Sequence, residues 1–397
     1  MPPNVTSENI LTQRNVRDDN ENDKDLIIEN DWQLPEFSIK EIRDHIPSEL
    51  FQRDLLKSFY WVLHDLVIVG GLFYAATHIH RLPYKLQFIA WPAYWIAQGI
   101  VATGVWVLGH ECGHQAFSDY RVVNNTVGWV LHSFLLVPFH SWRLSHSMHH
   151  KKTGHIEHDE VFLPKTRAMV GLPKRENDPE ADGPHSLFEE APIVSMANLI
   201  LKLFFGWPLY LTLNSTGPLA KRNEKYLSHF NPKTSIYEAK HFWDIIVSDI
   251  GVVSMIGVLI YIARLTSTLD VIRYYVIPYS WVNFWLVLIT YLQHTDPALP
   301  HYSAKVWNFQ RGAALTIDRP YGFGIDYFQH HIADSHVAHH FFSTMPHYNA
   351  VKATHYIKKA LGPHYCRDDT PIPIAAYRAQ TLCRYIEDEG DVLFFKN

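Results

Sequence analysis

The sequence predicts an all-α membrane protein, with four transmembrane helices in two hairpins and a cytosolic helical cap that holds a histidine-ligated metal site. Two observations support this fold class. The apolar residues are gathered into long blocks, and a block of about 20 residues can cross the roughly 30 Å of hydrocarbon in a bilayer. In addition, three dense histidine clusters lie at or just beyond the ends of such blocks, at residues 110–114, 146–150 and 336–340.

Composition narrows the class further. The 397 residues carry 35 Lys and Arg against 40 Asp and Glu, so no basic field suggests a nucleic-acid partner. The 3 cysteines form no paired framework, which fits a reducing compartment. Residues 1–34 are polar and show no signal-peptide pattern, so we predict a disordered cytosolic tail there and one membrane domain over residues 35–397.

Four apolar segments are the predicted spans, at about residues 59–78, 88–108, 245–262 and 276–292. Two further apolar segments, at about residues 127–139 and 193–213, are predicted to be interfacial. The first is too short to cross, and a crossing there would put the first two histidine clusters on opposite sides of the membrane. The second contains Lys202 and Pro208 and precedes a lysine-rich stretch expected in the cytosol. Both termini and all three clusters are then cytosolic.

Histidines three or four residues apart lie on one face of a helix, where their rings can converge on one ion. Eight such ligands exceed the four of a tetrahedral zinc site and indicate two ions of higher coordination. A di-iron pair with open positions can activate dioxygen for attack on an unactivated C–H bond of a lipid. The eight residues are His110, His114, His146, His149, His150, His336, His339 and His340.

Two other interpretations compete with the di-iron site. Residues 110–114 also fit the H-E-x-x-H pattern of zinc proteases, although that site leaves the other two clusters without a role. A non-enzymatic membrane protein could use histidines to sense pH, but sensing does not require this spacing. Single histidines such as His45, His64 and His229 are best explained by local hydrogen bonds or surface positions.

The longer strings around the clusters carry a family resemblance. They read His110-Glu-Cys-Gly-His-Gln-Ala-Phe-Ser118, Trp142-Arg-Leu-Ser-His-Ser-Met-His-His150 and His336-Val-Ala-His-His-Phe-Phe-Ser-Thr-Met-Pro-His-Tyr348. They resemble the three histidine boxes of membrane fatty acid desaturases. With residues 159–162 and 291–295, the resemblance is to the acyl-lipid delta-12 (oleate) and omega-3 branch in a fungal-like form, from about residue 35 onward.

The resemblance implies which residues bind metal. The eight clustered histidines correspond to iron ligands, and His294 corresponds to a ninth at the end of the last span. Four acidic residues could accept the second ring N–H of a ligating histidine, with helix capping or solvated charge as the alternative: Glu111, Asp159, Glu160 and Asp334. Asp296 departs from the family pattern, which usually has an aliphatic or similar residue, or a histidine, at this position.

The resemblance also implies an activity, namely oleoyl to linoleoyl conversion with dioxygen and two electrons. Omega-3 desaturation, a bifunctional enzyme and hydroxylation remain alternatives. The sequence has neither a Rossmann glycine fingerprint nor the His-Pro-Gly-Gly signature of a fused haem domain, so we expect no bound nucleotide or haem. The family implies cytochrome b5 and its NADH-dependent reductase as electron donors. The sequence leaves a homodimer open.

The chain end bears on location. Residues 392–397 are aromatic and carry a lysine next to the last residue, and they resemble the retrieval tails of plant oleate desaturases. This resemblance predicts an enzyme of the endoplasmic reticulum membrane. The alternative is an ordinary packed or frayed terminus.

Overall fold

The computed structural model describes residues 32–173, 191–218, 221 and 224–397. The predicted tail at residues 1–34 therefore lies almost entirely outside the described residues. The described part is mostly helical, which confirms the helical class. Apart from isolated β-bridges, the described residues contain one antiparallel pair of two-residue strands, β1 (His301–Tyr302) and β2 (Val392–Leu393).

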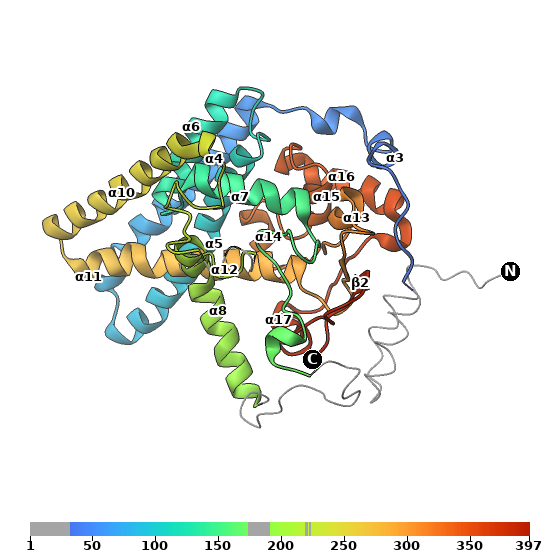
Figure 1. Cartoon of the computed structure of the whole chain (residues 1–397). Helices are drawn as coiled ribbons and strands as arrows, with labels where there is room; N and C mark the ends of the chain where they lie inside the picture. The colour runs from blue at the N-terminus through green and yellow to red at the C-terminus, as the bar shows by residue number, and fades with distance from the viewer. Residues whose placement is uncertain (1–31, 174–190, 219–220, 222–223) are drawn as a thin grey trace.

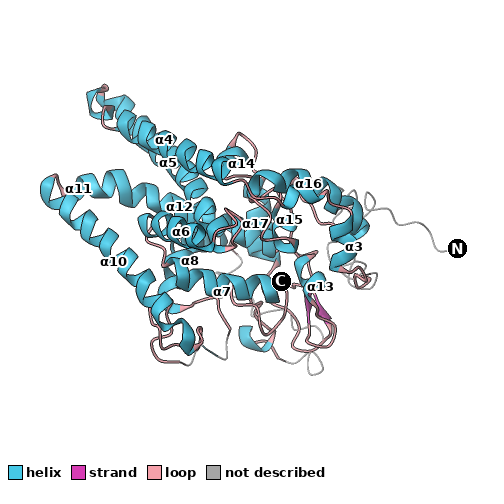
Figure 2. Ribbon diagram, turned by 90° about the horizontal axis from the view of Figure 1, so that it is seen from above, coloured by secondary structure: helices cyan, strands magenta, loops and turns pink. Residues whose placement is uncertain are grey.

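All four segments predicted as spans lie in long helices (Figures 1 and 2). The helices α4 and α5 form one side-by-side pair, joined through the short 3-10 turn η3, and α12 packs against α5. The helix α10 joins α12 through α11 and one π-helical turn, but it diverges from α12 in Figure 2 and packs on α6 and α7 instead. The bounds are α4 (Leu55–Ala76), η3 (Ile79–Arg81), α5 (Tyr84–Gly113), α10 (Phe242–Leu265), α11 (Thr268–Val271), η6 (Ile272–Val276) and α12 (Ile277–His294).

The segment at residues 127–139 is not one helix. It is divided between α6 (Arg121–Phe134) and α7 (Phe139–Lys152), which meet at an angle of 106°. Leu136 between them has a φ of +56°, a left-handed conformation that no helix continues through. Pro138 follows and has no N–H to donate. The chain therefore turns sharply here and brings the second cluster back beside the first.

The helix α8 (Pro192–Leu213) is long and apolar enough to cross a membrane, so five helices pass this test among the described residues. Its direction differs from that of the other four. In Figure 1 α8 runs steeply downward while α12 lies along the horizontal, and in Figure 2, turned by 90°, α8 is foreshortened. The helix α8 thus crosses α12 at a steep angle, and the two pack together where they cross.

The cap consists of short helices that follow the last long helix, together with the segment before α4. The first cap helix, α3, begins with a capping box: the Ser38 side chain accepts from the backbone N–H of Glu41, and the Glu41 side chain accepts from that of Ser38. The third histidine cluster lies on α15, one of the helices that follow α12. The bounds of the cap helices are α3 (Ile39–Asp44), η2 (Ser48–Phe51), α13 (Phe309–Ala313), α14 (Ile325–Phe328), α15 (His336–Phe341), α16 (His347–Leu361), η7 (Gly362–His364) and α17 (Ile372–Leu382). Two further 3-10 turns lie in the connections before α8 and before α10, η4 (Ala168–Val170) and η5 (Ala239–His241).

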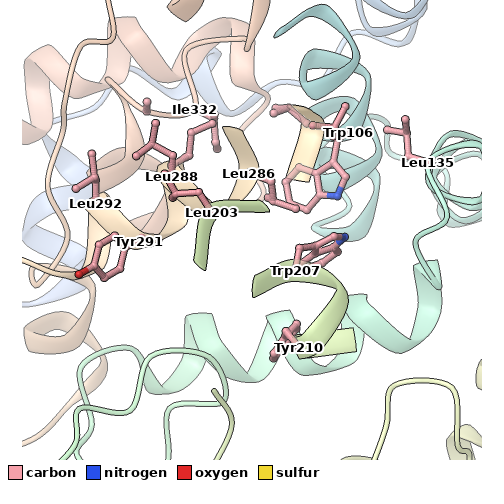
Figure 3. Packing of buried hydrophobic residues seen from close by; sticks show 14 of the residues in the cluster. Trp106, Leu135, Leu203, Trp207, Tyr210, Leu286, Leu288, Tyr291, Leu292 and Ile332 are labelled. Carbon is pink, nitrogen blue, oxygen red and sulfur yellow. The ribbon is translucent and has the colours of Figure 1, made fainter. Parts of the chain in front are cut away.

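The largest apolar core lies where α5, α8 and α12 meet the cap (Figure 3). Trp106 of α5, Trp207 of α8 and Leu292 of α12 are all buried there. Because Trp106 and Leu292 stand only a few residues before His110 and His294, this core fixes the ends of two helices that carry histidines of the site.

The C-terminal residues are part of the fold. Leu393 and Phe394 are 5% exposed, β2 pairs with β1, and the ring of Phe395 contacts His301 at 4.9 Å between centroids. Of the two alternatives for residues 392–397, the structure supports the packed terminus. The tail therefore gives no independent support for a retrieval signal.

Candidate metal centre

Four elements bring the nine proposed histidines together. The last turn of α5 supplies His110, and His114 is the C-cap of that helix. The helix α7 supplies the second cluster, α15 supplies the third, and His294 is the last residue of α12. All four elements end or begin at the cap side of the long helices, which is why clusters separated by more than two hundred residues can meet.

The histidines form two adjacent groups. In the first, one nitrogen from each of five rings lies within 4.8 Å of the others: His110, His114, His146, His150 and His339. The second contains His149, His294 and His340 by the same measure. His336 joins the second group, since its Nε2 lies 3.0 Å from Nε2 of His294. The two groups touch where the rings of His150 and His340 stack at 4.1 Å.

Three rings of the second group are held so that Nε2 faces its centre. Nδ1 of His149 donates to Asp159 Oδ1 at 2.7 Å, and Nδ1 of His336 donates to the Ile332 carbonyl at 3.1 Å. Thr153 Oγ1 gives its own hydrogen to the His149 carbonyl, so it must accept from Nδ1 of His340 at 3.2 Å. Each ring thereby keeps its lone pair on Nε2.

This arrangement fits bound cations. Neutral rings with converging lone pairs repel one another at the observed spacings, such as 3.3 Å between the Nε2 atoms of His149 and His294. In the first group, Nε2 of His150 similarly lies 3.1 Å from that of His146 and 3.2 Å from that of His339. Burial, reinforced by neighbouring histidines, lowers the pKa of His339 and His340 well below the usual value near 6.5. Neutral imidazole is the form that binds metal.

The four acidic residues differ in what they contact. Asp159 is buried and accepts from His149. Although burial acts to raise it, the pKa of Asp159 is lowered by His149 and by the N–H groups of Val161 and Phe162. A carboxylate in this position fixes the ring and strengthens it as a ligand. Asp159 thus matches its predicted geometry.

The other three acidic residues make different contacts within the described part of the chain. Glu111 accepts the backbone N–H of His347 at 2.8 Å, and its nearer oxygen is 3.7 Å from Nδ1 of His110. Glu160 pairs with Lys221, and Asp334 pairs with His331 at 3.0 Å. No hydrogen bond from a clustered histidine ring to these three carboxylates is present there.

Aromatic rings support the histidines, a role that the sequence analysis did not assign. Trp106 stacks on His110 at 5.4 Å and Trp142 stacks on His146 at 4.6 Å. Phe162 stacks on His294 at 5.1 Å. The signal for the two tryptophans is present in the sequence, because each stands four residues before its histidine on the same helix.

Asp296, the departure from the family pattern, has a structural explanation. Its carboxylate is 3% exposed and lies 2.6 Å from Arg319 and 2.9 Å from Arg378. Arg319 also donates to the Leu292 carbonyl at 3.0 Å. These bonds hold the backbone on both sides of His294.

Comparisons with known proteins agree with this geometry. The family described as Fatty acid desaturase matches residues 89–371. A Delta(12) fatty acid desaturase of Mortierella alpina is 52% identical over 373 residues, covering 93% of this chain and 92% of that protein. A Delta(12) fatty acid desaturase of Calendula officinalis is 44% identical, covering 90% of each chain. An oleate hydroxylase of Claviceps purpurea is 40% identical, covering 93% of this chain and 82% of that protein.

Proposed function

The chain belongs to the fatty acid desaturase family, and from this premise we propose that it is a delta-12 desaturase. It inserts a cis double bond into oleoyl groups of membrane lipids to give linoleoyl groups. One observation carries the chemistry: nine histidines from four elements converge in a buried centre at the cap end of apolar helices. The regiochemistry is supported by relatives named Delta(12) desaturases from two Mortierella species, each 52% identical.

The residues of the chain have separate tasks in this reaction. The nine histidines would hold two iron ions, which would supply dioxygen activation. Asp159 and Thr153 hold the rings of His149 and His340 in the ligating orientation. The apolar core beneath the rings excludes water, so the acyl chain is the group that is oxidised and side reactions with water are prevented. No side chain acts as a nucleophile.

The overall reaction sets what must come from outside. Two neighbouring methylenes lose two hydrogen atoms, and one dioxygen becomes two waters. The balance requires two electrons and two protons. The electrons come from a separate one-electron carrier that docks on the cytosolic cap, and the family resemblance implies cytochrome b5 with its NADH-dependent reductase in the endoplasmic reticulum membrane.

Hydroxylation is a second candidate, because the Claviceps purpurea relative is named an oleate hydroxylase. Expression in a yeast that lacks polyunsaturated lipids separates the candidates by gas chromatography of its fatty acids. We expect a linoleate peak with the wild-type chain and none with a variant that lacks His339 and His340. Ricinoleate in place of linoleate would establish hydroxylation, and linolenate appearing only with added linoleate would establish omega-3 activity.

We also propose that four helices cross the membrane and that α8 lies at the cytosolic interface. The angle between α8 and α12 supports this (Figures 1 and 2), and Lys202 of α8 is tied to the cap by a 2.6 Å bond to Gln380. The number of crossings supports it as well. If α8 crossed, the start of α10 would lie on the luminal side, whereas α10 packs on α6 and α7 beside the second cluster.

Cysteine labelling in sealed microsomes tests this topology. In a Cys366→Ser/Cys383→Ser background, where the remaining Cys112 is 0% exposed, single cysteines are placed at exposed positions on each side. We expect Lys233→Cys and His355→Cys to react with a membrane-impermeant maleimide directly, and His80→Cys and Thr266→Cys only after detergent. Protection of Lys233→Cys would mean that α8 crosses. The natural Asn214-Ser-Thr216 sequon is no substitute reporter, because Asn214 is 1% exposed.

A further inference from the structure

Another group of ionisable side chains lies outside the metal centre, between α4, α14 and the loop before α15. We propose that Tyr327, His64, Asp65 and His330 form a proton relay from the protein surface to the metal centre. This inference rests on the proposed function, because desaturation consumes two protons per turnover at a site closed to water.

The contacts form a continuous chain. Tyr327 is 43% exposed, and its hydroxyl lies 3.1 Å from Nε2 of His64. Nδ1 of His64 lies 2.9 Å from Oδ1 of Asp65, and the other oxygen of Asp65 lies 2.7 Å from Nε2 of His330. Asp65 is 0% exposed and His330 is 2% exposed. The chain therefore starts at the surface and ends in the interior.

The inner end of the relay opens toward the metal centre. Nδ1 of His330 is buried and has no hydrogen-bond partner among the described residues. His330 lines a small cavity, with room for about one water, together with Ser335, His347, Glu111 and the proposed ligand His339. Nε2 of His347 is also buried without a partner there, and its ring lies 4.6 Å from that of His330. The cavity is a route for the last transfer.

The position of Asp65 argues for a function. From Tyr84 to Gly104, α5 rises roughly 30 Å at 1.5 Å per residue, so the Asp65 carboxyl beside Gly104 sits near the cytosolic edge of the hydrocarbon layer. An ionisable group at such a place is costly to bury and is commonly functional. A methyl group at Gly104 would lie 2.1 Å from the Phe328 carbonyl and 3.0 Å from Asp65, so only glycine allows this approach.

The backbone at the inner end is also unusual. His330 and the next residue, His331, have φ of +54° and +58°. A side chain on such a residue crowds its own backbone, so this conformation is strained relative to an ordinary one. The left-handed pair turns the His330 ring inward to Asp65 while His331 turns outward to Asp334.

Transfer of one proton along the relay leaves the net charge of the relay unchanged. At the start, Asp65 carries a proton on the oxygen that faces His330, and both rings carry theirs on Nδ1. Tyr327 passes its hydroxyl proton to Nε2 of His64 and regains one from solvent, and the Nδ1 proton of His64 passes to the other oxygen of Asp65. The first Asp65 proton passes to Nε2 of His330, and the Nδ1 proton of that ring leaves into the cavity. One proton enters for each that leaves, and the rings then return to their first tautomers. The other ionisable groups near the chain are Lys57, Glu111, Asp326, His331, Asp334 and His347.

Asp65→Asn tests the relay because it keeps the shape of the side chain and removes its ability to carry a proton. We expect about a 100-fold loss of turnover, the scale of losing an acid–base group, with a larger solvent deuterium isotope effect and unchanged iron content. Asp244→Asn is the matched control, since Asp244 pairs with His241 at 3.0 Å on α10, away from the relay. We expect this variant to keep wild-type turnover.

A second measurement does not depend on activity. In full-length protein loaded with Zn²⁺, which is redox-inert, ¹⁵N-histidine spectra report how fast each ring N–H exchanges with D₂O. The signals are assigned with His64→Gln and His330→Gln. We expect Asp65→Asn to slow N–H exchange at His330 and to leave exchange at His64 fast, because the substituted residue lies between the two rings in the relay.

The outcomes are distinct. If Asp65 is only structural, its loss loosens the site and exchange at His330 becomes faster or stays unchanged, which would overturn the relay. Turnover of Asp65→Asn within twofold of wild type would also overturn it. If the chain proves not to make linoleate, the zinc measurement still reports whether protons travel along these residues, so failure of the relay and failure of the proposed function are separable.

Discussion

Replacing His339 with alanine is expected to reduce linoleate formation to below about 1% of the wild-type value. His339 lies at the middle of the first group, with ring centroids 4.6–4.8 Å from those of His110, His114 and His150. Its loss removes one of the five ring nitrogens that converge in this group, so the metal would lack one ligand. Even the loss of a residue that only hydrogen-bonds to a ligand costs 10–100-fold in metal affinity or activity, so a ligand should cost more.

The measurement combines fatty acid analysis with iron content of the purified protein, at equal membrane abundance. The control is His355→Ala, because His355 is exposed on α16. His229 is not a suitable control: it is 0% exposed and its Nε2 lies 3.1 Å from Ser145 Oγ, beside the second cluster. Full iron content and product in His339→Ala would refute the assignment of this residue, and one tightly bound zinc without iron would refute the di-iron centre.

The second large effect is on stability. Arg319 is 1% exposed and donates to Asp296, Asp368 and the Leu292 carbonyl. Arg319→Met keeps much of the volume but leaves two buried carboxylates with Arg378 as their shared cation. Removing one partner of a buried ion pair costs about 3–5 kcal/mol, which we expect as a fall of roughly 4–6 °C in the apparent melting temperature of a chain of this length.

The matched control is Arg53→Met, which breaks an ion pair with Asp119, whose side chain is 66% exposed. Such surface pairs contribute about 0–1 kcal/mol. Equal melting temperatures for Arg319→Met and Arg53→Met would contradict a structural role for the network. Burial acts to raise the pKa of Asp368, but Arg319 and its other partners bring it below the usual 3.8. The stabilisation is therefore fully present above about pH 4 and is lost only as the pH falls below that value.

The parts of the fold that follow from local sequence were predictable. Apolar runs located α4, α5, α10 and α12 to within a few residues, because a membrane helix needs about 20 apolar residues whatever it packs against. The meeting of the three clusters was inferred from their shared histidine spacing, and the assignment of the two interfacial segments followed from it. His294 was proposed by resemblance and by its position at the end of the last predicted span, since a single histidine at a helix end has no periodic signal.

Other features could not be predicted because they depend on contacts between distant residues. Arg319 and Asp368 are 49 positions apart, and Asp65 and His330 are 265 positions apart. The expectation of a local hydrogen bond for His64 holds for its contact with Asp65 but does not include its contact with Tyr327. The direction of α8 also escapes a hydropathy argument, because an interfacial helix and a spanning helix can have similar composition.

The strand pair described above has a consequence for biosynthesis. β1 follows closely after His294, but its partner β2 lies beyond the third cluster. While the chain is being made, the helices carrying His110 and His294 can enter the membrane long before β2 leaves the ribosome. The histidines of the first two clusters and His294 therefore form only part of the site until the third cluster and β2 have been synthesised. We therefore expect metal loading to be a late step: a chain stalled on the ribosome before the third cluster and β2 emerge should be inserted in the membrane but unable to retain iron.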